Sequence, residues 1–232
     1  MSEYPEPAGD TDLTVVGALL AEPARAKVLL ALADGRSLAA SVLAAEAGVA
    51  ASTASHHLAR LVHAGLICAE ARGRHRYFTL AGPHVAELIE AVARVSPPQP
   101  ITSLRQGTRA HAVRYARRCY DHLAGRLGVA VADALLEHGV LADGNGSTGY
   151  VITDEGAPTL AELGIDVRAG ELARGCLDWT EQRNHIAGAL GGALMTRLLD
   201  LGWVIRDSNT RALRLTGAGR ANLPLRLGVR LP

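Results

Sequence analysis

The sequence is poor in lysine, in cysteine and in long apolar runs, and each shortage narrows what the protein can be. Of its 24 basic residues only Lys27 is not an arginine, and arginine is the side chain suited to bidentate contacts with phosphate and guanine. The net charge of +1 argues against a uniformly basic coat for nucleic acid. Three cysteines without a secretory signal indicate a reducing compartment, so we expect the protein in the cytoplasm.

Motifs of several other protein classes are also missing. No apolar run approaches the length of about 18 residues that spans a membrane, so we expect no membrane partner. The chain has no phosphate-binding loop, no dinucleotide glycine fingerprint and no Gly-x-Ser-x-Gly elbow. Cys176 and His185 would need a third, orienting group to act as a nucleophile pair, and the sequence identifies none. We therefore predict that the protein is not an enzyme.

The chain is long enough, at 232 residues, for two modest domains. Residues 1–12 carry four acidic residues and two prolines and predict a disordered acidic tail. A proline-rich stretch, Ser96-Pro97-Pro98-Gln99-Pro100, predicts a stiff, extended linker. We therefore expect a first domain over residues 13–95, a linker over residues 96–102 and a second domain over residues 103–232.

Residues 37–80 hold the pattern around which the chain is organised. Apolar periodicity predicts a helix over about 38–47 and a second helix over about 51–64, with Gly48 ending the first. Val42 and Leu43 are expected on the buried face of the first helix. Two strands, over residues 66–71 and 76–80, should follow and meet at a basic turn. This order predicts a helix-turn-helix with a wing, whose second helix enters a DNA groove.

Polar and basic side chains remain outside the predicted core of this winged unit. The hydroxyls that open the second helix suit phosphates, Ser55 and His56 can reach base edges, and Arg60 suits a phosphate. The basic wing can follow the DNA backbone or enter the minor groove. The candidate DNA-binding residues are Ser52, Thr53, Ser55, His56, Arg60, Arg72, Arg74, His75 and Arg76. The alternative is a winged helix that contacts proteins and does not bind DNA.

The stretch LAAEAGVAASTASHHLARLVHAGLI, followed by GRHRYFTL, resembles the ArsR family of bacterial winged-helix repressors. The match covers roughly residues 14–95. The resemblance implies a symmetric homodimer whose second helix enters the major groove, with repression that a ligand relieves. Two differences stand out. Ala50 and Ala51 replace the Ser and Gln that are common in the family, which removes a helix cap, and the first helix lacks the Cys-x-Cys pair of metal-sensing members.

The second half predicts helices and hairpins of its own. We expect long helices over residues 103–127 and 179–201, and a hairpin from strands 203–206 and 211–215. Tyr150-Val-Ile-Thr153-x-x-Gly156 is echoed by Leu213-Arg-Leu-Thr216-x-x-Gly219, through either duplication or shared turn chemistry. The predicted fold class is mainly α with small β-hairpins (α+β). The N-terminal winged helix-turn-helix would precede a helical domain carrying a second winged-helix-like hairpin.

Cysteine and histidine recur in the second half at positions that suit a ligand site. On the predicted helix over residues 103–127 they form one stripe, which contains His111, Tyr115, Cys119 and His122. If the next long helix faces this stripe, thiolates and imidazoles converge. Such a site suits zinc, another soft metal ion, a metalloid ion, or redox sensing. The candidate effector or metal residues are Cys119, His122, Cys176, Asp178 and His185.

Structural interpretations of the same residues stay open. Cys119 also belongs to an apolar stripe, where cysteine behaves as a small buried hydrophobe. Asp178-Trp179-Thr180-Glu181 has the pattern of a capping box, which would give Asp178 a role at a helix start. Cys68 should be packed in the wing strand. No Cys-x-x-Cys spacing supports a metal site.

Together these patterns predict a cytoplasmic, homodimeric, DNA-binding transcriptional regulator, and the ArsR resemblance suggests a ligand-responsive repressor. Its partners would be double-stranded operator DNA with a pseudo-palindromic sequence, a second copy of the chain, and a small-molecule or metal effector. In one alternative the second half supports oligomerisation alone. In another the chain is a metal- or thiol-responsive sensor that works through Cys119 and Cys176.

Overall fold

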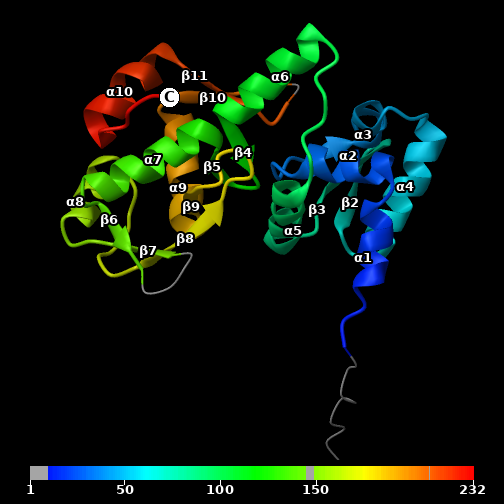
Figure 1. Ribbon diagram of the computed structural model, residues 1–232, viewed down its shortest axis with the longest axis horizontal. Coiled ribbons are helices and arrows are strands. Elements are labelled where there is room, and N and C mark those ends of the chain that lie inside the picture. The colour runs from blue at the N-terminus through cyan, green and yellow to red at the C-terminus, as the bar shows by residue number, and fades with distance from the viewer. Residues whose placement is uncertain (1–9, 145–148, 209) are drawn as a thin grey trace, which may run out of the picture. The chain divides into compact units, whose positions relative to one another are not determined.

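The computed structural model describes residues 10–144, 149–208 and 210–232, whose contacts divide the chain into two compact units (Figure 1). One unit contains the residues up to Leu30 together with Ser37–Ala81, and the other contains Ala31–Arg36 and Gly82–Pro232. The helix that follows the wing thus groups with the second unit, whereas we expected it in the DNA-binding domain. Our domain limits stay a prediction, and most of the predicted acidic tail lies outside the described residues.

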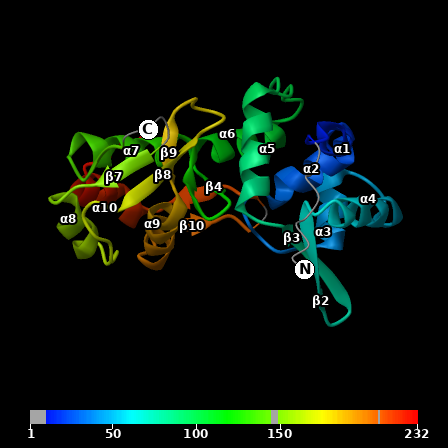
Figure 2. The same cartoon turned by 90° about the horizontal axis from the view of Figure 1, so that it is seen from below.

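The first unit is a winged helix-turn-helix. Its elements are α1 (Leu13–Leu20), α2 (Pro23–Leu32, which continues into the second unit), β1 (Leu38–Ala39), α3 (Ala40–Ala47), α4 (Ala51–His63), β2 (Ile67–Arg72) and β3 (His75–Leu80). The strands form an antiparallel sheet in the order β1-β3-β2. Gly48 ends α3 at a φ of 74°, a conformation that glycine adopts without steric cost. Figure 2 shows the β2–β3 hairpin projecting from the helices of this unit.

The core of the winged unit forms from most of the apolar positions that the periodicity marks. Leu43 of α3 and Leu58 and Leu61 of α4 are no more than 2% exposed. Val42 is 44% exposed, so its predicted core position is wrong, because the buried face of α3 runs instead through Leu43, Ala44 and Ala47. Cys68 is exposed and not packed, since every residue of β2 after Ile67 faces solvent.

The second unit mixes helices with short antiparallel strands. Its elements are α5 (Pro83–Val95), α6 (Leu104–Tyr115), β4 (Arg117–Cys119), β5 (His122–Ala124), α7 (Gly125–Glu137), β6 (Leu141–Asp143), β7 (Gly149–Ile152), α8 (Gly156–Glu162), β8 (Leu172–Leu177), β9 (Asn184–Ala187), α9 (Gly188–Asp200), β10 (Val204–Arg206), β11 (Leu213–Leu215) and α10 (Gly217–Leu227). Strands β6 to β9 form one sheet in sequence order, while β4–β5 and β10–β11 are separate hairpins. The α+β class and the hairpin near residues 203–215 are confirmed. Within the described part of the chain, no helix has the length and apolar character that crossing a membrane requires.

The limits of the two long helices predicted in this unit are wrong. The first helix ends earlier than we expected, at Tyr115, and the second starts later, at Gly188. Between α6 and α7 the chain forms the β4–β5 hairpin, because Tyr120 and Gly125 adopt φ values of 54° and 79° that a right-handed helix excludes. The second predicted helix starts at Gly188, not at Trp179. Residues 178–183 instead connect β8 to β9, with Gln182 at a φ of 54°.

The second unit contains one series of elements twice. Residues 117–162 (the first repeat) run hairpin, helix, hairpin, helix, and residues 172–227 (the second repeat) run the same way. The long helices α7 and α9 have 13 residues each. His122 and His185, which lie just before these helices, are 63 positions apart in the sequence. Because Thr153 and Thr216 have the same separation, the echo in the sequence is part of a whole repeated unit, which favours duplication.

Each Thr-x-x-Gly segment of the echo has the same structural task in both repeats. The hydroxyl of Thr153 accepts the Gly156 amide at 2.8 Å, and that of Thr216 accepts the Gly219 amide at 3.0 Å. A Cβ atom on Gly156 would lie 2.0 Å from the carbonyl oxygen of Val140, and one on Gly219 would lie 2.1 Å from that of Trp203. Each threonine hydroxyl therefore binds a main-chain amide at the start of the following helix, with Thr216 as the N-cap of α10. The glycine lets that helix approach the backbone that precedes the hairpin.

Candidate DNA interface and Cys₂His₂ cluster

The nine candidate DNA-binding residues are all exposed, and all lie on α4 or on the β2–β3 hairpin. Helix α4 begins after Ala50, whose side chain provides no cap, so the first amides of the helix have no side-chain acceptor there. Such a helix start can bind a phosphate oxygen. The Ser55 hydroxyl donates to the Ala51 carbonyl at 2.9 Å and keeps its oxygen as an acceptor. His56, one turn into the helix, is also exposed, and in the described part of the chain its side chain forms no hydrogen bond to the main chain.

The charges of the wing are not equally available. The Arg72 guanidinium donates to Oε2 of Glu70 at 2.6 Å and lies 5.2 Å from the centre of the Tyr77 ring. The hydrogen bond from Arg72 lowers the pKa of Glu70 and so keeps the pair charged. Arg74 lies at the turn beside Gly73, which has a φ of 62°. The acidic neighbour offsets part of the charge of Arg72, and Arg74 is the guanidinium at the tip.

Two β-hairpins bring two cysteines and two histidines together in the second unit. Cys119 faces His122 across β4–β5, and Cys176 faces His185 across β8–β9. One donor atom from each of the four lies within 4.8 Å of the others, and the two imidazole Nε2 atoms are 3.1 Å apart. Cys176 is half-buried and the other three are buried. We call these four residues the Cys₂His₂ cluster; it contains four of the five predicted effector residues.

A carboxylate lies behind each histidine of the cluster. Oδ1 of Asp121 is 2.8 Å from Nδ1 of His122, and Oδ2 of Asp178 is 3.5 Å from Nδ1 of His185. Asp178, the fifth predicted effector residue, also accepts the Gly125 amide at 2.7 Å. It is therefore placed to orient His185 and the start of α7, and it does not belong to the group of four donors.

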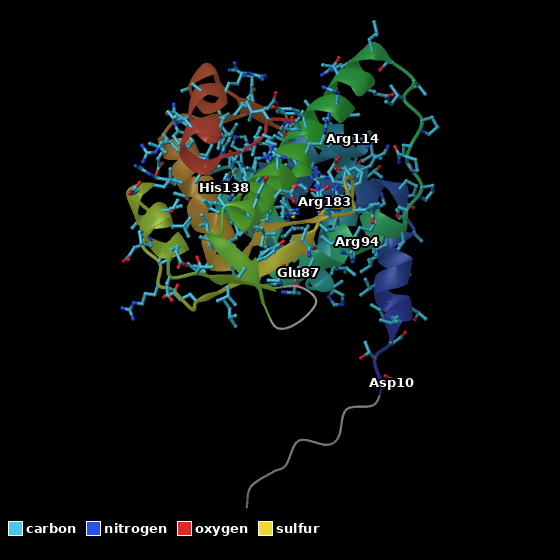
Figure 3. The ribbon with its side chains drawn as sticks, turned by 60° about the vertical axis from the view of Figure 1, so that its left-hand side comes forward. Asp10, Glu87, Arg94, Arg114, His138 and Arg183 are labelled. Atoms are coloured by element: carbon cyan, nitrogen blue, oxygen red, sulfur yellow. The ribbon has the colours of Figure 1, made fainter. Side chains whose placement is uncertain are left out.

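A buried arginine holds Asp178 in place. The Arg117 guanidinium, which is fully buried, donates to Oδ2 of Asp178 at 3.0 Å and lies 3.5 Å from a carboxylate oxygen of Glu90 on α5. Its guanidinium carbon also lies 5.0 Å from the centre of the Trp179 ring, a cation–π contact. The connection between β8 and β9 is further tied to α7 by Arg183, labelled in Figure 3, which donates to Asp133 at 2.5 Å.

The surroundings shift the pKa values of the two thiols in opposite directions. The hydrogen bond from the Cys119 thiol lowers the pKa of Cys176 against the effect of burial, and His122 and His185 lower it further. The same hydrogen bond, together with burial, raises the pKa of Cys119. The cluster therefore favours a thiolate at Cys176, the form that binds soft metal ions and attacks electrophiles.

The neighbouring ionisable groups follow the same pattern. Burial lowers the pKa of His122, but hydrogen bonds to Asp121 and Cys176 outweigh it and raise the pKa above the ordinary value. Burial, the largest single influence, raises the pKa of Asp178, but the Arg117 charge together with hydrogen bonds from Thr180 and the Gly125 amide outweighs it and brings that pKa to about 2. The carboxylate behind His185 is thus ionised at neutral pH.

The sequence placed Cys119 and His122 in one site for the wrong structural reason. They lie on a hairpin, whereas His111 and Tyr115 belong to α6 and are not part of the cluster. Asp178 does accept the amides of Thr180 and Glu181, at 2.8 and 3.2 Å, as a capping residue would. It does so in the turn between β8 and β9 and not at a helix start, so the capping box is also wrong.

The sequence analysis did not predict a role for Arg117 or Asp121. Both residues belong to the β4–β5 hairpin, and the sequence does contain a signal for that hairpin. His122-Leu-Ala-Gly-Arg-Leu-Gly128 recurs as His185-Ile-Ala-Gly-Ala-Leu-Gly191, and a cysteine precedes each histidine. Aligning the two stretches would have revealed the repeat and would have paired Cys119 with Cys176 by position in the fold.

Comparisons with known proteins identify the family. Residues 20–67 match the family model described as a helix-turn-helix domain. The HTH-type transcriptional regulator YdfF of Bacillus subtilis is 39% identical over 225 residues, which cover 95% of this chain and 99% of YdfF. The chain belongs to the HTH-type transcriptional regulators. Because the alignment covers nearly the whole chain, the likeness to YdfF includes both units of this regulator.

Further relatives share a smaller part of the regulator. The HTH-type transcriptional regulator CmtR of Mycobacterium bovis and Mycobacterium tuberculosis is 36% identical over 100 residues, 41% of this chain and 84% of CmtR. Among solved structures, the homodimeric winged helix-turn-helix DNA-binding domain of Mb0332 from Mycobacterium bovis is 33% identical. It covers 37% of this chain and 86% of that chain, with a TM-score of 0.32.

The sequence prediction of a winged helix-turn-helix transcriptional regulator is thus confirmed in its fold and general function. The protein is a DNA-binding transcriptional regulator with a long C-terminal extension. The relatives are named as transcriptional regulators, which agrees with the prediction that the chain is not an enzyme.

Proposed function

We propose that the regulator binds a pseudo-palindromic operator as a homodimer in the cytoplasm, and that a ligand held by its second unit changes its affinity for DNA. The observation that carries the DNA part is the exposure of all nine candidate residues on α4 and the wing. In a winged helix-turn-helix, the second helix of the motif lies in the major groove and the wing reaches the flanking backbone.

The residues of α4 and the wing have separate tasks in this proposal. Ser52 and Thr53 hold a phosphate together with the uncapped amides at the start of α4. Ser55 and His56 reach base edges and supply sequence preference. Arg74 contacts the backbone or the minor groove from the tip of the wing, and its contribution does not depend on sequence.

A second copy of the chain is the natural partner for the N-terminal helix. The apolar side chains of Leu13 and Val15 on α1 are 75% and 56% exposed. Apolar residues on the outside of a short helix favour contact with another protein surface. A two-fold dimer would place the two α4 helices about one DNA turn apart and would account for a pseudo-palindromic operator.

The Cys₂His₂ cluster supports the ligand part of the proposal. Two thiols and one imidazole with shifted pKa values converge with a second imidazole inside the second unit, whereas the candidate DNA-binding residues belong to the first unit. Such clusters are more frequent at functional sites than in ordinary cores. By the precedent of the ArsR resemblance, the ligand would relieve repression.

Fluorescence anisotropy tests the DNA part directly. The purified regulator is titrated against DNA from its own promoter and against random duplex, at several salt concentrations. We expect His56→Ala to weaken promoter binding by roughly tenfold with little effect on random duplex, the size of one lost base contact. Arg74→Ala should weaken both and reduce the salt slope by about one phosphate contact. Arg220→Ala, an exposed arginine on α10, is the matched control and should change neither.

The same titration can refute the proposal. Binding to the promoter that is no tighter than binding to random duplex at every salt concentration, with the second unit both free of and saturated with metal, would exclude a specific operator in that promoter. Binding that is specific but unaffected by either α4 or wing variants would assign the DNA contact to another surface.

A further inference from the structure

We propose that Cys119, His122, Cys176 and His185 bind one divalent cation of the zinc type in a tetrahedral site that joins the two repeats. This inference names the ligand for the second unit and rests on the proposed function only for its effect on DNA. The site is made of two identical halves, since each repeat contributes one cysteine and one histidine that face each other across a hairpin.

The chemistry of the donors selects the ion. Two thiolates with two imidazoles are a ligand set of zinc and other soft or borderline cations, whereas magnesium and calcium require oxygen ligands. The charge of two thiolates balances that of a divalent cation, so the filled site is neutral. Neutrality matters here because three of the four residues are buried, and an unbalanced buried charge is strongly unfavourable. On binding, the Cys119 thiol loses its proton to solvent.

The spacing of the donors is close to that of a tetrahedral site. Zinc lies about 2.0–2.1 Å from nitrogen and about 2.3 Å from sulfur, which sets ligand–ligand separations of roughly 3.3–3.8 Å. The Nε2 atoms of His122 and His185 are 3.1 Å apart, and all four donor atoms lie within 4.8 Å of one another. Small side-chain movements therefore bring the four atoms to the distances that a single ion requires.

The orientation of the imidazoles gives an independent argument. Asp121 lies 2.8 Å from Nδ1 of His122, and the Asp178 carboxylate lies 3.5 Å from Nδ1 of His185. At His122 the hydrogen-bonded carboxylate keeps the proton on Nδ1 and leaves the lone pair on Nε2, which is the usual outer arrangement of a zinc-bound histidine. Nδ1 of His185 faces the Asp178 carboxylate but forms no hydrogen bond with it. The two Nε2 atoms lie 3.1 Å apart, close enough for both to bind one proton or one cation between them.

The backbone around the cluster holds the two halves together in a reciprocal way. A Cβ atom on Gly191 of α9 would lie 3.0 Å from Cβ of His122, and one on Gly128 of α7 would lie 3.6 Å from Cβ of His185. Each histidine is thus packed against the helix of the other repeat, so the imidazoles are positioned before any ion arrives. Cys176, the half-buried member, gives the ion a path from solvent.

Cobalt is the probe for this site, because tetrahedral cobalt with sulfur ligands has strong visible bands and a sulfur-to-cobalt charge-transfer band in the near ultraviolet. The full-length regulator is reduced, treated with a chelator and titrated with Co²⁺, and the Co²⁺ is then displaced with Zn²⁺. We expect one cobalt per chain with a tetrahedral spectrum, complete displacement by zinc, and a higher melting temperature with zinc than without it.

Variants assign the ligands. Cys176→Ser, at the half-buried position, should weaken metal binding by more than about 100-fold and abolish or shift the charge-transfer band. Asp121→Asn should weaken it by roughly 10-fold, as is typical for a partner of a ligand histidine, with the band retained. Cys68→Ser is the matched control, since this exposed cysteine lies on the wing, and it should leave both spectrum and affinity unchanged. Circular dichroism of each variant verifies that it is folded.

The outcomes separate this inference from the proposed function. A wild-type chain that is reduced and folded but binds no cobalt, or gives the weak spectrum of octahedral cobalt, would overturn the metal site. So would formation of a Cys119–Cys176 disulfide in air with no metal binding after reduction, which would assign the cluster to redox chemistry. If zinc binds as expected but operator affinity does not change, the metal site stands and the ligand-responsive part of the proposed function falls.

Discussion

The two repeats of the second unit carry the same donors on hairpins whose turns differ. In the first repeat only Tyr120 and Asp121 connect β4 to β5, whereas six residues, from Asp178 to Arg183, connect β8 to β9. In both hairpins a cysteine faces a histidine in register. The strand register that pairs these two side chains is therefore common to the repeats, and the turn length is free to vary.

The carboxylates near the two histidines differ in burial and in the residues that they contact, because they lie on turns of different length. Asp121 stays local: its side chain is 48% exposed and contacts the histidine next to it in sequence. Asp178 is fully buried and bonds to Arg117 and Gly125 of the first repeat. The longer turn thus provides a buried connection between the repeats, while the shorter turn provides only a partner for its own histidine.

The largest expected loss of stability comes from removing the Asp178 carboxylate, which connects the two repeats. Asp178→Ala removes one partner of a buried ion pair and should lower the free energy of unfolding by about 3–5 kcal/mol, because Arg117 stays buried with less compensation. Asp121→Ala, on an exposed turn, should lower it by less than about 1 kcal/mol. Urea denaturation of the metal-free protein measures both. Equal losses for the two variants would show that Asp178 does not connect the repeats in the way we describe.

A smaller effect is expected from the glycines at which each long helix lies against the strand that precedes it in the same repeat. A Cβ atom on Gly191 would lie 2.4 Å from the Ile186 carbonyl oxygen, and one on Gly128 would lie 2.6 Å from that of Leu123. Each alanine variant should therefore destabilise the second unit by about 1–3 kcal/mol through overpacking.

The neighbouring Gly192 provides the control for these glycine variants. Its added Cβ would meet only the Asp121 side chain, at 3.6 Å, so Gly192→Ala should be tolerated. Gly191→Ala should be the more harmful of the two repeat variants, since its Cβ would also crowd His122. Thermal unfolding ranks the three. A Gly191→Ala protein as stable as Gly192→Ala would contradict the close packing of α9 against Ile186 and His122.

The smallest expected loss of stability comes from the two threonines that have equivalent contacts in the two repeats. Thr153→Ala and Thr216→Ala each remove a hydroxyl that binds a main-chain amide at the start of a helix, and each should lower the free energy of unfolding by about 1 kcal/mol. Because the two sites have equivalent contacts, the losses should be similar, and the double variant should show their sum. Serine at either position keeps the hydroxyl and should restore most of the stability. If the two alanine variants lost very different amounts of stability, the structural equivalence of the two repeats would hold for the hairpins only.

The first unit could be predicted from the sequence nearly to the residue, because local signals determine it. Gly48 and Gly65 mark helix ends, α4 has apolar residues at helical spacing, and the wing alternates around a short turn. The exposed positions of the candidate DNA residues follow from the same spacing. The burial of Val42 was predicted wrongly because, in a helix of only eight residues, the apolar positions fit more than one face of the helix equally well.

The second unit could be predicted only in part, because long-range contacts determine it. Residues 116–124 have helical neighbours in the sequence, but the burial of Arg117 and its pairing with Asp178, 61 positions away, favour a strand. No local pattern reports such a contact. The cluster was predicted from residue types and from a helical spacing that the structure does not contain. The geometry that brings Cys119 to Cys176 comes from the repeat, of which only the Thr-x-x-Gly segments were recognised.

The order of the two units along the chain has a consequence during translation. All nine candidate DNA-binding residues lie before residue 77, whereas the Cys₂His₂ cluster is complete only with His185. At ribosomal rates of roughly 5–20 residues per second, the winged unit emerges many seconds before the second histidine does. A nascent or prematurely ended chain can therefore expose the winged unit while it has only half of the cluster. Under the proposed function, such a chain would bind DNA before its second repeat makes it able to respond to a ligand.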